Sequence, residues 1–280
     1  MNDKAFWQTV IANNYAIPDK EKLLVFTDEL LDYLAHPDPE LRDEFGYNIL
    51  TRWIAVYGYH STEQLIVMGQ WLLEQLDKGI GEINTDTVFL RSYSAAVLSL
   101  IVYRDVKEQF MSTRDVLTIL ETAQSYLLFE QDTRAHDPVK GWINAIANVT
   151  GLLRYLAMHP ALSKEQLQGI LETVSRKVCQ PADEAFNHDE EDRLARVVIP
   201  IMMRNDLDKT DYALWFNEIK MWLTTHETDG DYNATYNFTY QNIKRFLRAL
   251  HVQVLLANRV TDAATESQVD LLDAIREFSL

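Results

Sequence analysis

Apolar and polar residues follow one another along this chain with the period of an α-helix rather than that of a β-strand. The pattern is most extreme over residues 86–104, where apolar positions cover most of the helix circumference and leave no broad polar face. We therefore expect an inner helix there, contacted from several sides, and a second inner helix beginning after Asp137. The segments that begin at Asp19, Ser112 and Ser163 carry charges on one face, which predicts outer helices.

Signals for helix starts recur along the chain at nearly constant spacing. Ser61 with Gln64 and Ser163 with Gln166 form capping boxes, and Asp38 precedes a proline at the first helical position. The successive starts are Asp19, Asp38, Ser61, Asp86, Ser112, Asp137 and Ser163, separated by 19, 23, 25, 26, 25 and 26 residues, and further starts follow at Asp208 and Thr261. Two helices with their loops then take about 40 to 50 residues, which is the period of HEAT and armadillo repeats.

The fold class that this spacing predicts is all-α. No segment shows the alternation of a strand, and 9 glycines and 7 prolines are too few for a β-sandwich of 280 residues. We predict a single helical-repeat domain over residues 1–280, with about 11 to 13 helices paired as antiparallel hairpins and stacked as a HEAT- or armadillo-like solenoid. A closed α/α toroid is the alternative, because the sequence does not determine the curvature of the stack.

The net charge and the cysteine content indicate which partners and which cellular compartment to expect. The formal net charge of -16, from 42 acidic and 26 basic residues, repels phosphate backbones and anionic lipids, so we predict neither a nucleic-acid partner nor a membrane partner. Cys179 is the single cysteine, which excludes an intramolecular disulfide, and no signal peptide is recognisable, so a cytoplasmic location is expected. Arg176 and Lys177 could lower the pKa of the Cys179 thiol, although no base is in view to activate it.

Three segments together resemble a bacterial family, domain of unknown function 2785. They read "DTVFLRSYSAAVLSLIVYRD", "YLLFEQDTRAHDPVKGWINAIANVTGLL" and "NIKRFLRALHVQVLL", and the resemblance covers most of residues 85–255. The family pattern is D-[ST]-V-F-x-R-S-[FY]-S, then E-x-D-x-R-G, then a Gly-Trp-x-His-x-x-x-His helix with an aspartate three residues further on. The resemblance implies an all-helical, HEAT-like fold and no particular reaction.

The match to this pattern is close in the first two blocks and departs in the third. The matching residues are Asp86, Val88, Phe89, Arg91, Ser92, Tyr93, Ser94, Glu130, Asp132, Arg134, Lys140, Gly141 and Trp142. Ala135 stands where the family has glycine, Asn144 and Asn148 stand where it has the two histidines, and Gly151 stands in place of the aspartate. Two histidines four residues apart with a carboxylate could bind a transition metal or act as acid and base, and asparagine does neither well.

Four charged residues of the matching blocks form the most informative cluster. Arg91, Glu130, Asp132 and Arg134 are predicted to come from adjacent inner helices and to form an ionic network. Such a network could fix the stacking of the repeats, or it could anchor a small ligand or a peptide. The candidate residues for binding a ligand or partner are Arg91, Glu130, Asp132, Arg134, Trp142, Asn144 and Asn148; we predict no catalytic residue, no metal site and no cofactor.

Two hypotheses about function follow. The first is a non-catalytic module that binds a protein or peptide partner. The second is a degenerate α/α enzyme in which Asn144 and Asn148 replace a metal-binding or acid-base histidine pair. The stretch "DGDYNATYNFTY" starts like a calcium loop, with Asp229 and Asp231 at positions 1 and 3, but Tyr240 occupies position 12, where a glutamate is needed, so we interpret it as a polar loop.

Overall fold

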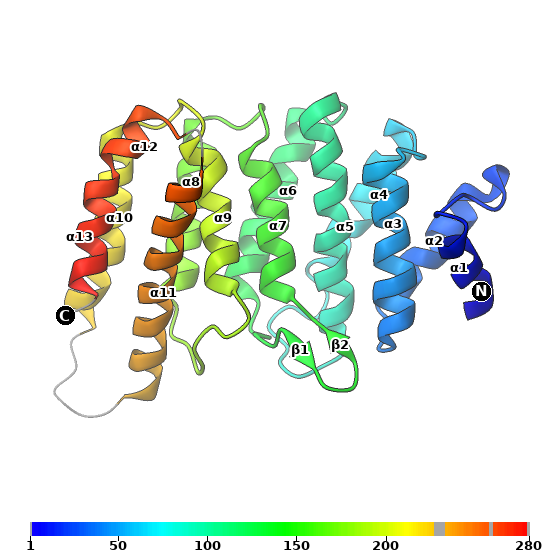
Figure 1. Cartoon of the computed structure of the whole chain (residues 1–280), viewed down its shortest axis with the longest axis horizontal. Coiled ribbons are helices and arrows are strands. Elements are labelled where there is room, and N and C mark those ends of the chain that lie inside the picture. The colour runs from blue at the N-terminus through cyan, green and yellow to red at the C-terminus, as the bar shows by residue number, and fades with distance from the viewer. Residues whose placement is uncertain (1, 227–232, 258–259, 279–280) are drawn as a thin grey trace. The chain divides into compact units, whose positions relative to one another are not determined.

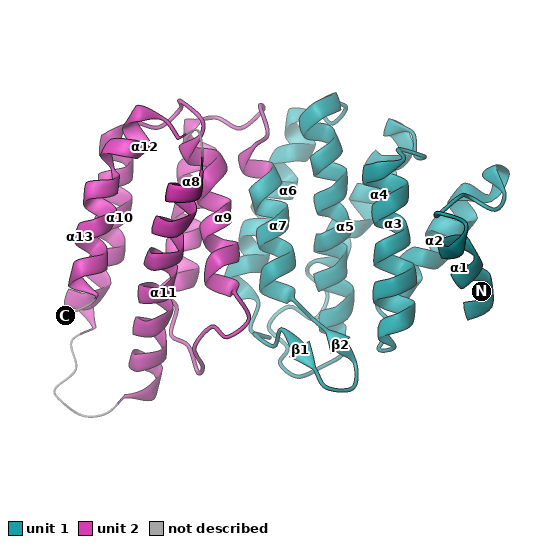
Figure 2. Ribbon diagram, viewed as in Figure 1, with its two compact units in different colours: residues 1–155 teal, residues 156–280 magenta. Residues whose placement is uncertain are grey.

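The computed structural model describes residues 2–226, 233–257 and 260–278, and these residues form an all-α protein, as predicted (Figure 1). The chain divides into two compact units, residues 1–155 and residues 156–280 (Figure 2). The expectation of one helical-repeat domain stays a prediction, as does the solenoid or toroid arrangement. No helix in the described part of the chain combines the length and the apolar character that a bilayer span requires.

The first unit contains the elements from α1 to most of α7. They are α1 (Lys4–Ala12), the short 3-10 helix η1 (Lys20–Lys22), α2 (Leu23–Tyr33), η2 (Glu40–Tyr47), α3 (Asn48–Thr51), η3 (Arg52–Val56), α4 (Thr62–Gln75), α5 (Thr87–Glu108), α6 (Thr113–Phe129), β1 (His136–Asp137), β2 (Gly141–Trp142) and α7 (Ala145–Ala157). The segments η2, α3 and η3 follow one another without a break, and η2 and η3 are wound with wider π-type turns.

The second unit contains the remaining helices. They are α8 (Lys164–Val178), α9 (Glu190–Met202), α10 (Lys209–Thr225), α11 (Ala234–Leu256), α12 (Asp262–Glu266) and α13 (Gln268–Glu277). Helices α9 and α11 pack against each other, and α13 packs against both α10 and α11. Large aromatic side chains such as Phe216 and Phe246 fill the space between the helices of this unit, and both are fully buried.

Most predicted helix starts are confirmed, because the signals act within a few residues. Ser61 forms the capping box with Gln64 at the start of α4, and Ser112 accepts a hydrogen bond from the Asp115 N–H at the start of α6. Asp208 caps α10 in the same way, with its own capping box. The inner position of α5 is also confirmed, because every residue from 91 to 102 is buried.

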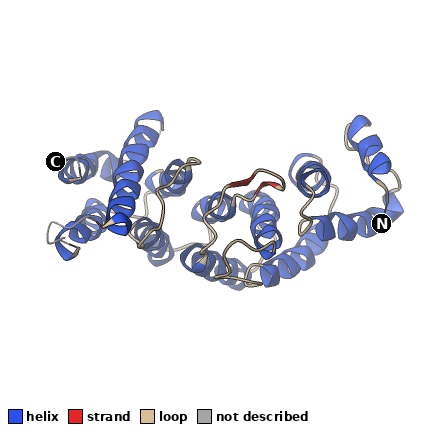
Figure 3. Cartoon of the chain, turned by 90° about the horizontal axis from the view of Figure 1, so that it is seen from below, coloured by secondary structure: helices blue, strands red, loops and turns tan. Residues whose placement is uncertain are grey.

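The predicted helix start at Asp137 is wrong. Residues 136–142 form a short antiparallel hairpin in which His136 pairs with Trp142, and α7 begins only at Ala145 (Figure 3). The Asp137 carboxylate accepts hydrogen bonds from the N–H groups of Val139 and Lys140, so it closes a turn instead of capping a helix. Gly141 then adopts a φ of +78°, which reverses the chain.

Candidate functional site

The matching motif residues meet around the loop of residues 130–144, which joins α6 to α7 in the first unit. Arg91 projects from α5, and Glu130 ends α6; both side chains are completely buried. Arg91 Nε lies 2.5 Å from Glu130 Oε2, and Arg91 Nη2 lies 2.9 Å from Glu130 Oε1, so the pair is bidentate. Burial alone would lower the pKa of Arg91, but its hydrogen bonds to Glu130 and the charge of that carboxylate outweigh burial and raise it.

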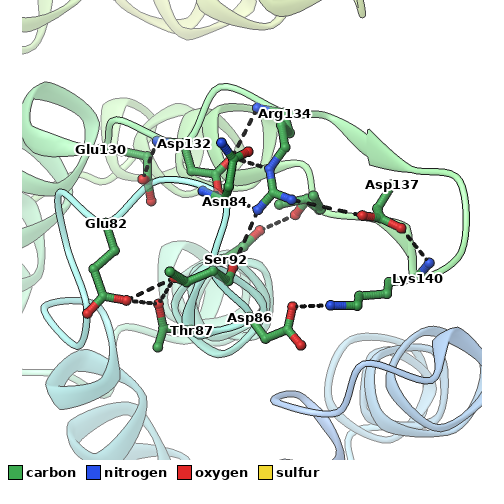
Figure 4. A network of polar contacts seen from close by, with 12 residues as sticks. Glu82, Asn84, Asp86, Thr87, Ser92, Glu130, Asp132, Arg134, Asp137 and Lys140 are labelled. Atoms are coloured by element: carbon green, nitrogen blue, oxygen red, sulfur yellow. Dashed lines mark hydrogen bonds and ion pairs between the residues drawn. The ribbon is translucent and has the colours of Figure 1, made fainter.

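Arg91 also fastens the loop between α4 and α5. Its Nη1 donates to the Thr87 hydroxyl over 3.0 Å, and its Nη2 donates to the Glu82 carbonyl oxygen over 3.3 Å. Figure 4 shows Glu82 and Thr87 beside this network. The guanidinium group therefore directs its donors to a carboxylate, a hydroxyl and a backbone carbonyl of the same unit.

The second ion pair of the network lies within the loop itself. Asp132 is completely buried, and its carboxylate oxygens lie 2.8 Å from Arg134 Nε and 2.5 Å from Arg134 Nη2 (Figure 4). Asp132 also accepts a hydrogen bond from the Asn84 N–H over 3.1 Å and donates its own N–H to Glu130 over 2.9 Å. Glu130, Asp132 and Arg134 therefore come from a helix end and a loop, and the prediction that adjacent inner helices supply them is wrong.

The two residues after Arg91 hold the far end of the same loop. The Ser92 hydroxyl donates to the Ile143 carbonyl oxygen over 2.5 Å, and it accepts a hydrogen bond from Asn148 Nδ2 over 2.9 Å. The Tyr93 hydroxyl donates to the Trp142 carbonyl oxygen over 3.2 Å. Arg91, Ser92 and Tyr93 stand in sequence on α5 and each contacts residues 130–143, so this motif anchors a loop.

Sequence reasoning missed Arg42, the other anchor of this loop. Arg42 lies in η2, is completely buried, and its Nη2 donates to the carbonyl oxygens of Lys140 and Trp142 over 2.6 and 3.1 Å. Its guanidinium group lies over the Phe89 ring at 4.1 Å. A Cβ atom at Gly141 would lie 3.0 Å from Pro39 Cβ and 3.4 Å from Arg42 Nη2, and the left-handed φ of this residue also favours glycine. No local signal links Arg42 to partners that follow it by 98 and 100 residues.

Asn144 and Asn148 do not lie on one helix, although the family pattern places both positions on a helix. Asn144 precedes α7 with a left-handed φ of +53°, and its N–H donates to the Ala135 carbonyl oxygen. Asn148 lies inside α7 and is bound to Ser92. At Gly151, an added Cβ atom would meet no atom within 4 Å. Trp142 lies in β2 rather than on a helix and is 49% exposed.

The remaining candidate features lie elsewhere in the chain. Burial raises the pKa of the Cys179 thiol to about 12, so the predicted lowering by Arg176 and Lys177 is wrong. Asp229 and Asp231 of the calcium-like stretch lie outside the described residues. Within the described residues, no group of three or more His, Cys, Asp or Glu side chains is placed to hold a metal ion.

A second feature of the first unit is a groove between α2 and α4, with a cavity volume of about 550 Å³. Its lining residues are Leu24, Thr27, Asp28, Leu31, Asp32, Glu63, Gln64, Val67, Met68 and Trp71. Leu24 and Val67 are 48% and 67% exposed, which is high for aliphatic side chains that line a concave surface. No pattern in the sequence predicts this groove, because it depends on how two separate helices are placed.

The border of the groove is acidic. Asp28 and Asp32 lie one helical turn apart on α2, and Glu63 lies in the first turn of α4. None of the three carboxylates forms an ion pair with a residue that the structure describes. Hydrogen bonds from the Glu63 N–H and the Ser61 hydroxyl lower the pKa of Glu63, so this carboxylate is charged at neutral pH.

Residues 76–252 match the model of the family described as Protein of unknown function (DUF2785). No curated protein and no solved structure matches the chain. The matched residues include Arg91 and the loop that it anchors. The groove between α2 and α4 lies before the matched segment.

Proposed function

This chain belongs to the protein family of unknown function DUF2785, and we propose that it works as a non-catalytic module that binds a protein or peptide partner. The observation that carries the proposal is the groove between α2 and α4, where apolar side chains are exposed in a concavity of about 550 Å³. Concave sites with exposed apolar residues are where proteins bind partners and ligands.

The arrangement of the motif residues supports the same proposal. Arg91, Glu130 and Asp132 are sealed in the protein, and they direct their polar atoms to one another and to backbone groups of the loop. Buried charges that are fully paired in this way hold a segment in one conformation. Their geometry therefore favours loop anchoring, and the exposed surface of the groove is left for contact with a partner.

The length of the groove suits a short peptide segment. Along α4 the lining residues run from Glu63 to Trp71, which corresponds to about 12 Å of helix. A bound helix of two to three turns would place apolar side chains at about every third or fourth residue along that distance.

Selection from a displayed peptide library tests the proposal. Enriched peptides should bind the wild-type protein and should lose binding to Val67→Asp, which places a charge on the apolar wall of the groove. Val269→Asp is the matched control, because Val269 on α13 is 62% exposed, close to the 67% of Val67. Either a library without enriched peptides, or peptides that bind Val67→Asp as well as wild type, would contradict the proposal.

A second candidate is a degenerate enzyme that has lost a metal site at positions 144, 148 and 151. The observation in its favour is the open space at Gly151, which would accommodate a carboxylate side chain near Asn148. The triple variant Asn144→His, Asn148→His, Gly151→Asp should then bind one zinc ion per chain, measured by titration calorimetry and by metal analysis. A triple variant that folds and binds no zinc would exclude this candidate.

A further inference from the structure

We infer that the partner bound in the groove between α2 and α4 is a cationic amphipathic helix of another protein. The inference rests on the proposed function and specifies the chemistry of its partner. It follows from three properties of the groove: an acidic border, an apolar floor, and helical walls whose interior backbone groups are already hydrogen-bonded.

The acidic border comes from both walls. Asp28 and Asp32 lie four residues apart on α2, so both face the same side of that helix, and Glu63 lines the groove from α4. Because no described residue forms an ion pair with them, the three carboxylates repel one another across the groove. Lys or Arg side chains along the edges of a partner would neutralise this repulsion, whereas acidic peptides and anionic lipids would increase it.

The floor of the groove is apolar and offers no unused hydroxyl group. Leu31 and Met68 are buried at its base, and Trp71 extends the apolar surface along α4. The Thr27 hydroxyl donates to the Leu23 carbonyl oxygen and lies 2.8 Å from His60 Nε2, so both of these contacts are within the protein. A partner would therefore meet an apolar centre with charges at its border, which is the usual anatomy of a protein interface.

The walls favour a helix over an extended strand. Both walls are α-helices, and the backbone N–H and C=O groups in their interiors are bonded within each helix. An extended peptide would find no sheet edge to pair with and would leave its own backbone groups unsatisfied at the floor. A helical partner satisfies its own backbone and presents only side chains.

Binding of three designed peptides, measured by fluorescence anisotropy, tests the inference. The first repeats Leu at helical spacing with Lys on the flanking positions, the second replaces every Lys by Glu, and the third contains the Leu and Lys of the first in scrambled order. We expect the Leu/Lys peptide to bind at least about tenfold more tightly than the other two, to gain helical circular dichroism on binding, and to weaken as salt is raised.

Charge-neutral variants identify the site. The variant Asp28→Asn, Asp32→Asn, Glu63→Gln should weaken binding of the Leu/Lys peptide by about tenfold. The matched control Glu44→Gln, Glu121→Gln, Asp183→Asn removes the same charge from exposed carboxylates outside the groove and should leave binding within about twofold. All six residues are exposed, so both variants should keep the wild-type thermal unfolding temperature.

The outcomes separate the inference from the proposed function. If the Leu/Glu or the scrambled peptide binds as tightly as the Leu/Lys peptide, or if the groove variant binds like its control, the cationic helix is wrong. The proposed function survives that result when library-selected peptides still depend on Val67. If no displayed peptide and no designed peptide binds, both proposals fail.

Discussion

The loop over residues 130–144 in the first unit and the loop over residues 180–189 in the second unit both follow a long helix, and side chains of another helix fasten each of them. In the first loop, the fastening includes completely buried ionic groups, Arg91 with Glu130. In the second loop, neutral groups of α11 take part: Asn242 accepts the Phe186 N–H over 2.7 Å, and Thr239 accepts the Ala182 N–H over 3.1 Å. Charged side chains also bind this loop, but through its backbone: Arg245 donates to the Phe186 carbonyl oxygen, and Glu190 accepts N–H groups of the loop.

The two kinds of contact respond differently when one partner is removed. Neutral hydrogen bonds can be lost one at a time, and each loss leaves one backbone group without a partner. A buried ion pair fails differently, because removal of either member leaves the other charge in a medium that cannot solvate it. The buried ion pair therefore holds the first loop more strictly in one conformation. A single substitution in that pair is also expected to destabilise the protein more.

Loss of one member of the buried pair should have the largest effect. Glu130→Gln leaves the Arg91 guanidinium buried beside a neutral amide, and we expect the free energy of unfolding to fall by about 3 to 5 kcal/mol. The double variant Arg91→Met, Glu130→Leu removes both charges and should recover more than half of that loss. Urea unfolding measures both values, and a loss below about 1 kcal/mol in Glu130→Gln would mean that burial does not set the strength of this anchor.

Acid should weaken the first unit through a buried histidine beneath the groove. Burial, followed by the positive charge of Arg104, lowers the pKa of His60 from 6.5 to about 4. Because the folded pKa lies below the unfolded one, the unfolded chain takes up the proton first. The stabilisation is therefore complete above pH 6.5 and is lost as the pH falls toward 4.

The expected loss over this pH window is about 2 to 3 kcal/mol. His60→Gln cannot titrate, so its free energy of unfolding should fall less between pH 6.5 and 4 than that of wild type. Urea unfolding at several pH values gives the difference between the two proteins. A difference that stays constant across the window would show that His60 is not the group responsible.

A substitution on α11 tests the neutral hydrogen bonds that hold the second loop. Asn242→Ala leaves the buried Phe186 N–H without its side-chain acceptor, and we expect a loss of about 1 to 2 kcal/mol. Asn217→Ala, at an exposed position on α10, is the control and should change stability by less than about 0.5 kcal/mol. A loss as large as that of Glu130→Gln would remove the distinction between ionic and neutral anchoring.

The two loops also show what could be predicted from the sequence. Helix starts such as Ser61 and Ser112 were predicted correctly, since a cap and its partner lie three residues apart. Asp137 was misread, because an aspartate that closes a turn and one that caps a helix look alike in sequence. The role of Arg42 and the groove could not be predicted. Both depend on contacts between segments that are distant in the sequence, and such contacts follow no periodic pattern.

The sequence predicted which residues form the candidate site but not how they are arranged. The sequence grouped Arg91, Glu130, Asp132 and Arg134 because the family pattern does, and the structure does bring them into one network. Their origin in a helix end and a loop was not foreseen, since a two-residue strand is too short to produce an alternating pattern. The role of the network in holding the loop can therefore be inferred only from the contacts of its atoms in the structure.

The smallest effect is expected from an exposed ion pair on the same loop. Lys140 Nζ lies 2.6 Å from Asp86 Oδ1, but the two side chains are 38% and 49% exposed. Water already solvates both charges, so Lys140→Ala should lower the free energy of unfolding by less than about 0.5 kcal/mol, and added salt should remove the difference. Glu130→Gln and Lys140→Ala each remove one charge from an ion pair that fastens residues 130–144, but only the first pair is buried. Comparing the two losses of stability therefore shows how much of the effect comes from burial. If the two losses were equal, the contrast between the loops would have to rest on backbone geometry, because burial would no longer distinguish their ion pairs.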